Sequence, residues 1–417
     1  MNIPTIDLPR VVFIGAGFAG LKLARQINSK NYQVVLIDKN NYHTFQPLLY
    51  QVASAGLEPD SIAYPIRKII SKKSNTYYRM ASVETINLEG KIVETSIGKL
   101  KYDKLVIATG AGNNFFGNAT IEANAIPMKS LTEALDLRSK TLQNFEKALN
   151  SNDIKEREKL MNFVIVGAGP TGVELAGALA ELKNKILPKD FPDLDLRLMK
   201  IHLIEAAPRI LSAMDKKSSE KAREYLKKLG VHVWADTLVK DYVDGTIHTN
   251  GEDFYSDNLI WAAGVKGQIP LGIDVSRIGR GNRIKVNEYC QLPDNDAVFV
   301  LGDVALVESE KHPNGYPMMG SVAMQQGAYL ANYFNRKAVN KSVKPFHYND
   351  KGSMATIGKN RAVVETKGFK FQGVFAWFIW MWNYFKYNNG LRLIIRPYIK
   401  GKQKKENLKK RPSAQTE

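Results

Sequence analysis

The fold is decided by the stretch Val11-Val12-Phe13-Ile14-Gly15-Ala16-Gly17-Phe18-Ala19-Gly20. Its first four residues form a short apolar run that predicts a buried strand, and a helical pattern follows from Leu21 to Ile27. In such a GxGxxG turn the first glycine permits the tight turn, the second lets the backbone approach a diphosphate, and the third lets helix and strand pack closely. We therefore predict a strand, turn and helix that bind a dinucleotide at the helix N-terminus.

The next apolar run supports this interpretation. Residues 34–37 read Val-Val-Leu-Ile and predict a second strand, which ends at Asp38. A carboxylate at this distance from the glycines can accept hydrogen bonds from a ribose. Asp38 is therefore a candidate ribose ligand.

The same construction occurs a second time. An apolar strand at residues 163–166 runs into Gly167-Ala168-Gly169-Pro170-Thr171-Gly172, and a helix follows. The next strand, residues 201–204, ends at Glu205, which would bind adenosine ribose hydroxyls and repel a 2′-phosphate. This favours NADH over NADPH, although Arg209, four residues later, could weaken the discrimination.

Composition limits the chemistry. The 417 residues are enough for two or three domains, and the net charge of +18 would attract anionic lipid, nucleic acid or anionic cofactors. The single cysteine, Cys290, cannot form a redox disulfide within the chain, so the electron carrier must be a bound cofactor. Residues 1–9 lack a secretory pattern, which favours the cytoplasm, and no metal site is predicted.

Three further strands indicate how the two sites are connected. Residues 105–110 and 259–264 are apolar strands that run into small-residue turns, typical of the closing strand of a nucleotide domain. Residues 298–303 form a strand that ends in Gly302-Asp303, where Asp303 could hold the ribityl and diphosphate part of FAD. The chain therefore has two GxGxxG turns, two closing strands and a late Gly-Asp motif. This order of motifs resembles that of the flavoproteins with two dinucleotide-binding domains.

The resemblance implies an α/β fold with two Rossmann-like domains, in which the NADH domain is inserted into the FAD domain. The expected boundaries are 1–117 and 269–345 for the FAD domain, 118–268 for the NADH domain and 346–417 for a C-terminal membrane-anchoring and dimerisation region. The implied FAD ligands are Gly15, Gly17, Gly20, Asp38, Thr109, Asp303 and Gln325. The implied NADH ligands are Gly167, Gly169, Gly172, Glu205 and Gly264.

Two segments narrow the resemblance. Disulfide reductases and sulfide:quinone reductases need paired cysteines, which this chain lacks. Residues 41–53 and 323–327 instead resemble segments of type II NADH dehydrogenases. That resemblance implies that Gln325 and Gln326 lie where quinone meets the flavin, that Glu174 lies near nicotinamide and flavin, and that Lys359 lies near the quinone site. The alternatives are a helix-capping role for the glutamines, a structural Glu174 and an ordinary surface lysine.

The C-terminal sequence is rich in aromatic residues and then in lysine. The run at residues 374–385 holds three of the five tryptophans, and is too short for the roughly 20 residues that span a bilayer. Residues 391–399 mix apolar side chains with arginine, and lysines crowd residues 400–411, which favours an anionic lipid surface. A core helix at a dimer interface with a disordered basic tail is the alternative.

We therefore expect a peripheral, non-proton-pumping NADH:quinone oxidoreductase on the cytoplasmic face of the membrane. It would be a homodimer that uses FAD and NADH, reduces a membrane quinone and binds no nucleic acid. Two alternatives stay open: a soluble NADH-dependent reductase of a small redox protein, and a regulatory NADH-binding flavoprotein.

Overall fold

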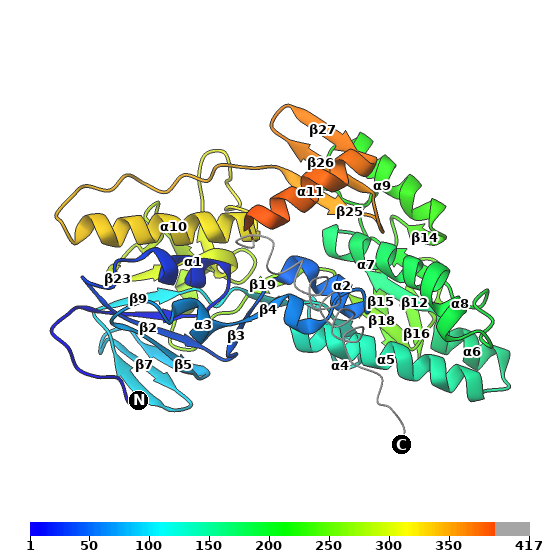
Figure 1. Ribbon diagram of the computed structural model, residues 1–417, viewed down its shortest axis with the longest axis horizontal. Helices are drawn as coiled ribbons and strands as arrows, with labels where there is room; N and C mark the ends of the chain where they lie inside the picture. Colours follow the sequence, from blue (N-terminus) through cyan, green and yellow to red (C-terminus); the bar gives the residue numbers. More distant parts are fainter. Residues whose placement is uncertain (388–417) are drawn as a thin grey trace, which may run out of the picture. The chain divides into compact units, whose positions relative to one another are not determined.

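The computed structural model describes residues 1–387, which form two compact units (Figure 1). Unit 1 comprises Met1–Thr44, Tyr64–Asn114 and Gly264–Lys351. Unit 2 comprises Phe45–Ala63, Phe115–Ala263 and, among the described residues, 352–387. Each unit contains one GxGxxG turn, and the chain passes between the units more than once.

Unit 1 is built on a six-stranded sheet. Its order is β22 (Gln291–Leu292), β23 (Asn295–Val300), β9 (Lys104–Ile107), β1 (Arg10–Ile14), β2 (Gln33–Asp38) and β5 (Thr76–Met80). All neighbours are parallel except the edge pair β22–β23. The parallel strands place the residues that follow β1, β9 and β23, together with the end of β2, at one edge of the sheet. Gly15, Thr109, Asp303 and Asp38 are therefore brought to the same edge, where such sheets bind ligands.

Two helices of unit 1 pack against each other on this sheet. α1 (Phe18–Gln26) and α10 (Gly320–Lys337) lie side by side, as Figure 1 shows. A Cβ on Gly327 would lie 2.4 Å from the carbonyl oxygen of Ala19, so the glycine allows this close approach. α10 contains residues 323–327, one of the two segments that carry the resemblance to type II NADH dehydrogenases.

The rest of unit 1 is mostly short antiparallel sheet. β6 (Val83–Asn87), β7 (Ile92–Thr95) and β8 (Gly98–Lys101) form one sheet, and β10 (Ala111–Asn113) pairs with β19 (Val265–Gly267). A third sheet contains β20 (Ile278–Gly279), β21 (Arg283–Val286) and β24 (Ala305–Val307). The short elements β3 (Tyr42–Thr44) and α3 (Ile66–Ile70) complete the unit, and β4 (Ala63–Pro65) spans a boundary.

Unit 2 has a five-stranded parallel sheet. Its order is β11 (Ile126–Pro127), β18 (Asn258–Trp261), β12 (Phe163–Val166), β13 (Ile201–Ile204) and β14 (Val231–Trp234). α7 (Pro170–Glu181) packs on this sheet, with α9 (Lys216–Lys228) beside it. The meander of β15 (Val239–Val243), β16 (Thr246–Thr249) and β17 (Phe254–Tyr255) contributes apolar side chains to a core shared with β12 and β18.

Shorter elements surround this sheet. The helices are α2 (Leu49–Ala53), α4 (Ala119–Asn124), α5 (Leu131–Asn150), α6 (Ile154–Met161) and α8 (Leu187–Asp190), and a π-helical turn covers Leu182–Ile186. A small antiparallel sheet of β25 (Ser353–Thr356), β26 (Ala362–Thr366) and β27 (Phe369–Gln372) follows, and then α11 (Gly373–Tyr387).

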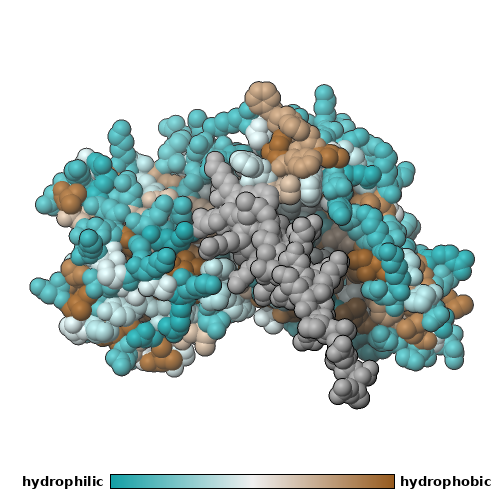
Figure 2. Space-filling view, viewed as in Figure 1, coloured by the Kyte–Doolittle hydropathy of each residue, from teal (hydrophilic) through white to brown (hydrophobic). Residues whose placement is uncertain are grey.

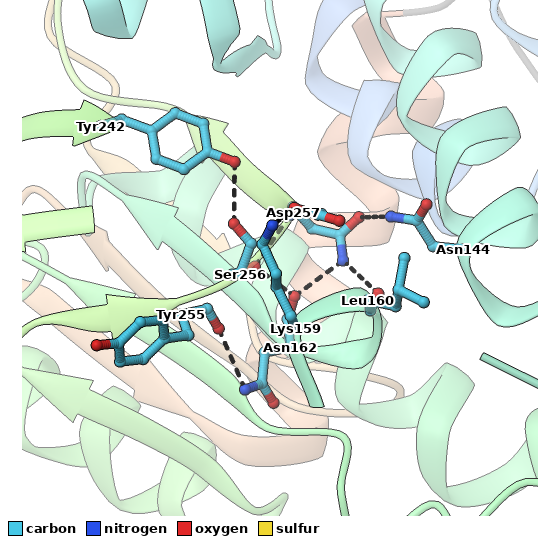
Figure 3. A network of polar contacts seen from close by, with 9 residues as sticks. Asn144, Lys159, Leu160, Asn162, Tyr242, Tyr255, Ser256 and Asp257 are labelled. Atoms are coloured by element: carbon cyan, nitrogen blue, oxygen red, sulfur yellow. Dashed lines mark hydrogen bonds and ion pairs between the residues drawn. The ribbon is translucent and has the colours of Figure 1, made fainter. Parts of the chain in front are cut away.

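A buried polar network fixes the start of β18 (Figure 3). Asn258 accepts a hydrogen bond from Asn144 of α5 at 2.9 Å and donates to the carbonyls of Leu160 and Asn162 at 2.8 and 2.9 Å. Ser256 donates to the same Asn162 carbonyl, and Tyr242 donates to the Ser256 carbonyl. Satisfied networks of this kind specify one arrangement of a core. This one ties α5, α6 and β15 to the strand that leads to Gly264.

α11 buries one side and exposes another. Ala376 and Trp380, four residues apart, are buried, and Ala376 packs with Ala362 and Val364 of β26. Phe375, Phe378 and Trp382 are 61%, 53% and 71% exposed, and Figure 2 shows apolar residues gathered over β27 and α11. In the described part of the chain no helix has the length and apolar character to cross a membrane. The predicted interfacial segment at 391–399 and the basic tail lie outside the described residues.

Candidate functional site: two dinucleotide cradles and a buried glutamate

The first cradle is the GxGxxG turn of unit 1. Gly15 has a φ of +101°, and a Cβ there would lie 2.3 Å from the carbonyl oxygen of Ala108. A Cβ on Gly20 would lie 1.9 Å from the carbonyl oxygen of Gly15, so both positions require glycine for packing. Gly17 differs, because a Cβ there would have no atom within 4 Å. Gly17 is also the N-cap of α1 and gives it no side-chain cap.

These features fit the diphosphate of FAD. The space that a Cβ on Gly17 would occupy is open at the N-terminus of α1, where the helix dipole favours an anion. The three glycines thus have separate tasks, as the sequence predicts: two shape the turn and one leaves room for a ligand.

Asp38 closes the first turn from the end of β2. Its carboxylate accepts hydrogen bonds from the backbone N–H of Ala16 at 2.6 Å and of Asn40 at 2.7 Å. Burial raises its pKa, while these two hydrogen bonds act in the opposite direction. A carboxylate has about four acceptor sites, so Asp38 can hold the turn and still accept from ribose hydroxyls.

Thr109 and Asp303 occupy neighbouring strand ends. The Thr109 hydroxyl donates to the carbonyl of Gln268, which ties the end of β9 to the chain that follows β19. Asp303 is half-buried in the 3₁₀ turn Gly302–Val304, and its charge acts on Arg283, whose pKa is lowered chiefly by burial. Both residues lie at the sheet edge that the first cradle occupies.

The two glutamines of α10 differ in environment. Gln326 is 1% exposed, and its carbonyl accepts from the backbone N–H of Gly302 at 2.6 Å. Gln325 is partly exposed and pairs with the backbone of Asn349, donating to its carbonyl and accepting from its N–H, each at 3.0 Å. Each amide has two donors and two acceptor sites, so Gln325 keeps one N–H and one lone pair for a ligand.

The second cradle, in unit 2, repeats the first. Gly167 has a φ of +100°, and a Cβ there would lie 2.7 Å from backbone atoms of Ala263. A Cβ on Gly172 would lie 1.9 Å from the carbonyl oxygen of Gly167, whereas one on Gly169 would meet nothing within 4 Å. Gly169 is the N-cap of α7 and makes no side-chain cap. The second turn therefore also leaves a helix N-terminus open to a diphosphate.

Glu205 contacts the glycine turn of unit 2 in the same way as Asp38 contacts that of unit 1. It accepts from the backbone N–H of Ala168 at 2.7 Å and of Ala207 at 2.9 Å. Arg209, a possible 2′-phosphate ligand, instead donates to the carbonyls of Met214 and Ser212 at 2.6 and 2.8 Å. Its guanidinium is thus engaged with the backbone, whereas the Glu205 carboxylate is hydrogen-bonded to the second turn.

Gly264 lies where the chain leaves unit 2. It has a φ of +79°, and its carbonyl accepts from the N–H of Asn114 at 3.3 Å. Among the predicted NADH ligands it alone belongs to unit 1.

Glu174 is buried in the second turn of α7. It is 6% exposed, and burial raises its pKa to about 8. The backbone N–H of Thr356 donates a hydrogen bond to its carboxyl at 3.3 Å, which lowers the pKa and so opposes the effect of burial. The Thr356 hydroxyl lies 2.9 Å from that of Tyr50, which accepts from the amide of Gln51 at 3.0 Å. A carboxyl that titrates near neutral pH is suited to exchange protons during catalysis.

Lys359 is exposed in the turn between β25 and β26. Its neighbours Gly358 and Asn360 both have positive φ, +62° and +64°. Gly358 packs on α7, because a Cβ on Gly177 would lie 2.6 Å from the Gly358 nitrogen. The turn is therefore fixed to the helix that carries Glu174, while the lysine side chain points into solvent.

Comparison with known proteins agrees with this geometry. The model of the pyridine nucleotide-disulphide oxidoreductase family matches residues 9–327. The type II NADH:quinone oxidoreductase Ndh of Mycobacterium tuberculosis is 36% identical over 94% of this chain and 88% of its own length. The chain belongs to the type II NADH:quinone oxidoreductases. NdhA of the same organism is also 36% identical, over 92% of this chain and 84% of its own length.

A solved structure supports the fold of this type II enzyme. It is described as NDH2 from Plasmodium falciparum in complex with NADH, and it is 22% identical with a TM-score of 0.84, covering 91% of this chain and 94% of its own. The family resemblance and the α/β fold with Rossmann-like dinucleotide regions, both predicted from the sequence, are confirmed.

Sequence reasoning missed two residues of the type II enzyme's buried cluster. Tyr50 lies within the segment 41–53 that carries the resemblance, but the sequence assigns it no role. Its neighbours in the sequence are mostly apolar, and they do not indicate which residue its hydroxyl contacts. Thr356 gave no signal, because it is an ordinary strand residue 182 positions from Glu174.

Proposed function

We propose that this chain oxidises NADH and reduces a membrane quinone, with FAD as the carrier between them. The observation that carries the proposal is the pair of cradles, each with an open helix N-terminus and a carboxylate that closes the turn. The only cysteine, Cys290, is fully buried, so no thiol pair can serve as the electron carrier. FAD, when bound, supplies the chemistry that links a two-electron donor to a quinone.

The two cradles take different nucleotides. Gly17, Asp38 and Asp303 would hold the diphosphate and sugar portions of FAD, and Gly169 and Glu205 would hold those of NADH. The Glu205 carboxylate would repel the 2′-phosphate of NADPH, and Arg209, bound to backbone carbonyls, offers that phosphate no compensation. We therefore propose NADH as the donor in preference to NADPH.

The quinone site would use residues that donate hydrogen bonds or protons. Gln325 has an amide N–H left over from its pairing with Asn349, and this group can bind a quinone carbonyl without titrating. Gln326 would not contact the quinone but would position Asp303, because its side-chain carbonyl accepts a hydrogen bond from the backbone N–H of Gly302. Glu174, whose pKa burial raises to about 8, would supply a proton, and the exposed Lys359 would add a positive charge to the quinone site, as the resemblance implies.

Half-reactions test the proposal. The FAD-loaded protein is mixed anaerobically with NADH and flavin absorbance is followed, and then a short-chain quinone is added. Rapid bleaching followed by rapid recovery supports the proposal. Bleaching without recovery would mean that the acceptor is a protein or another molecule, and a flavin that never bleaches would contradict NADH oxidation altogether.

The membrane surface is a second part of the proposal. The exposed side chains of α11, together with Phe369 of β27 at 65% exposure, form an apolar surface suited to the headgroup boundary of an anionic bilayer. We propose peripheral binding of a homodimer at the cytoplasmic face. Sedimentation with anionic vesicles should fall sharply for the triple change Phe375→Ser, Phe378→Ser and Trp382→Ser, while the change Tyr255→Ser on the exposed edge of β17 should have no effect.

A further inference from the structure

We infer that Glu365 and Lys370, on two strands of the small sheet β25–β27, are positioning residues for the second glycine turn, and that they act through the loop at residues 206–215. This role rests on the proposed function, because NADH is the ligand proposed for that turn. All of these residues belong to unit 2. Figure 1 shows β26 and β27 beside α9, which begins where the loop ends.

Two hydrogen bonds hold the middle residue of the turn, Ala168. Its N–H donates to Glu205, and its carbonyl accepts from the N–H of Leu211 at 2.8 Å. A trans peptide unit is planar, so the Ala168 carbonyl and the Gly169 N–H share one plane and point in opposite directions. Leu211 therefore sets the direction of the Gly169 N–H, at the helix N-terminus where the diphosphate of NADH would bind.

The loop holds Leu211 in a conformation that few leucines adopt. Its φ is +47°, in the left-handed region that favours glycine, and its side chain is 2% exposed. Such a backbone persists only where the surroundings hold it. The Leu211 carbonyl accepts from the N–H of Met214 at 2.8 Å, and the Arg209 guanidinium donates to the carbonyls of Met214 and Ser212. These bonds close the loop on itself, and Asp215 is its last residue.

The small sheet contacts the loop at Asp215. Glu365 of β26 accepts from the Asp215 N–H at 2.9 Å, and the Lys370 ammonium of β27 lies 2.9 Å from the Asp215 carboxylate. Glu365 and Lys370 are opposite each other in the antiparallel pair, so their side chains lie on the same face of the sheet. The hydrogen bond from Lys370 lowers the pKa of Asp215, which keeps the carboxylate ionised for this contact.

The small sheet has supports of its own. Ala362 and Val364 of β26 pack on α11, and the Phe371 ring of β27 contacts that of Phe375. Side chains alternate along a strand, so Phe371 lies on the face opposite to Lys370. We therefore expect the sheet to keep its place when Lys370 is replaced, and the loop to be the part that loosens.

Two substitutions remove the contacts to Asp215. Lys370→Met removes the ammonium and keeps an unbranched side chain, and Glu365→Val removes the acceptor while favouring a strand. Glu365→Gln keeps an acceptor oxygen for the Asp215 N–H and is the conservative variant. The matched control is Lys200→Met, just before β13, at the end of the strand away from the turn. The Lys200 side chain is 48% exposed beside Glu158, and that of Lys370 is 50% exposed.

Hydrogen exchange tests the support of the loop without turnover. In the double variant Glu365→Val, Lys370→Met, the amides of residues 209–214 should exchange about tenfold faster, the combined effect of one hydrogen bond and one exposed ion pair. Lys370→Met alone should give about a threefold increase. Glu365→Gln and Lys200→Met should exchange like the wild type. Unchanged exchange of residues 209–214 in the double variant would overturn the inference.

Ligand affinity tests the effect on the turn. Calorimetry with NAD⁺ and the oxidised, FAD-loaded protein should give a Kd up to about tenfold higher in the double variant, because the Gly169 N–H is no longer held in line. KM for NADH should rise in proportion, while quinone should reoxidise the reduced flavin at the wild-type rate. A general loss of structure would instead slow both half-reactions.

Two outcomes separate this role from the proposed function. Faster exchange of the loop with wild-type NAD⁺ affinity would overturn the positioning role, because the loop would then not control the turn. A wild type that neither binds NAD⁺ nor bleaches with NADH would contradict the proposed function, and hydrogen exchange would still decide whether Glu365 and Lys370 support the loop.

Discussion

Replacing Glu174 with glutamine should make unit 2 more stable than the wild type at pH 9 but not at pH 5. Burial raises the pKa of Glu174 from the ordinary value of 4.5 to about 8. Below pH 4.5 the carboxyl is protonated in both the folded and unfolded states, so folding is not affected by its titration. Between pH 4.5 and 8 the unfolded chain releases the proton while the folded chain retains it, and stability falls as the pH rises.

The size of the effect follows from the shift in pKa. Each pKa unit corresponds to about 1.36 kcal/mol, so the full cost of ionised Glu174, reached above pH 8, is about 5 kcal/mol. Glutamine does not titrate and therefore lacks this cost. Its extra N–H adds a penalty of about 1–3 kcal/mol if it finds no partner, but that penalty is the same at both pH values and cancels in the comparison.

Tryptophan fluorescence provides the assay, since all five tryptophans, Trp234, Trp261, Trp377, Trp380 and Trp382, belong to unit 2. Urea unfolding of the FAD-loaded wild type and of Glu174→Gln is measured at pH 5 and at pH 9. Between pH 5 and pH 9, the free energy of unfolding of Glu174→Gln should rise by several kcal/mol relative to that of the wild type. A difference that does not change with pH would refute the reasoning, because it would mean that Glu174 is already ionised and compensated at pH 5.

The remaining predictions concern the cradles and the cysteine. Gly172→Ala should unfold unit 2 at lower urea, because its Cβ would lie 1.9 Å from the Gly167 oxygen, whereas Gly169→Ala should keep the wild-type urea midpoint and lose only NADH affinity. Glu205→Gln keeps one acceptor oxygen, whereas the carboxylate uses both of its oxygens. In steady-state assays the KM for NADH should therefore rise about tenfold, the equivalent of about 1.4 kcal/mol. The ratio of kcat/KM for NADH to that for NADPH should fall in the same assays. Cys290 is fully buried and its pKa is raised, so a thiol reagent at pH 8 should label it only after unfolding; labelling of the native protein would contradict its place in the core.

The cradles were predictable because their determinants are local in sequence. A GxGxxG turn between a strand and a helix places its own glycines, and the geometry at Gly15, Gly17 and Gly20 follows from that order. The sequence also identifies Asp38 and Glu205 as the residues at the strand ends. It does not reveal that each carboxylate already binds the middle alanine of its turn, because that contact depends on how closely two neighbouring strands lie.

The surroundings of Glu174 were not predictable in the same way. The Tyr50 and Thr356 hydroxyls meet across 306 positions of the chain, and neither residue type indicates a partner by itself. A glutamate within the otherwise apolar segment 173–180 suggests a special role. Its burial, and thus its raised pKa, depends on the packing of α2 and β25 against α7. Single-sequence patterns do not contain that packing.

Comparing the two cradles shows why Glu174 is better explained by function than by folding. The two turns align glycine for glycine, and the position of Glu174 in α7 corresponds to Lys22 in α1. Lys22 is only partly buried, so its charge stays hydrated, and the first cradle forms without a buried acid. The second cradle therefore does not need one either. Glu174 has no ion-pair partner in residues 1–387, and it destabilises the fold at alkaline pH, which a purely structural residue at this position would not do. A buried acid that costs stability, and whose pKa burial raises to about 8, is explained by the proton that it carries.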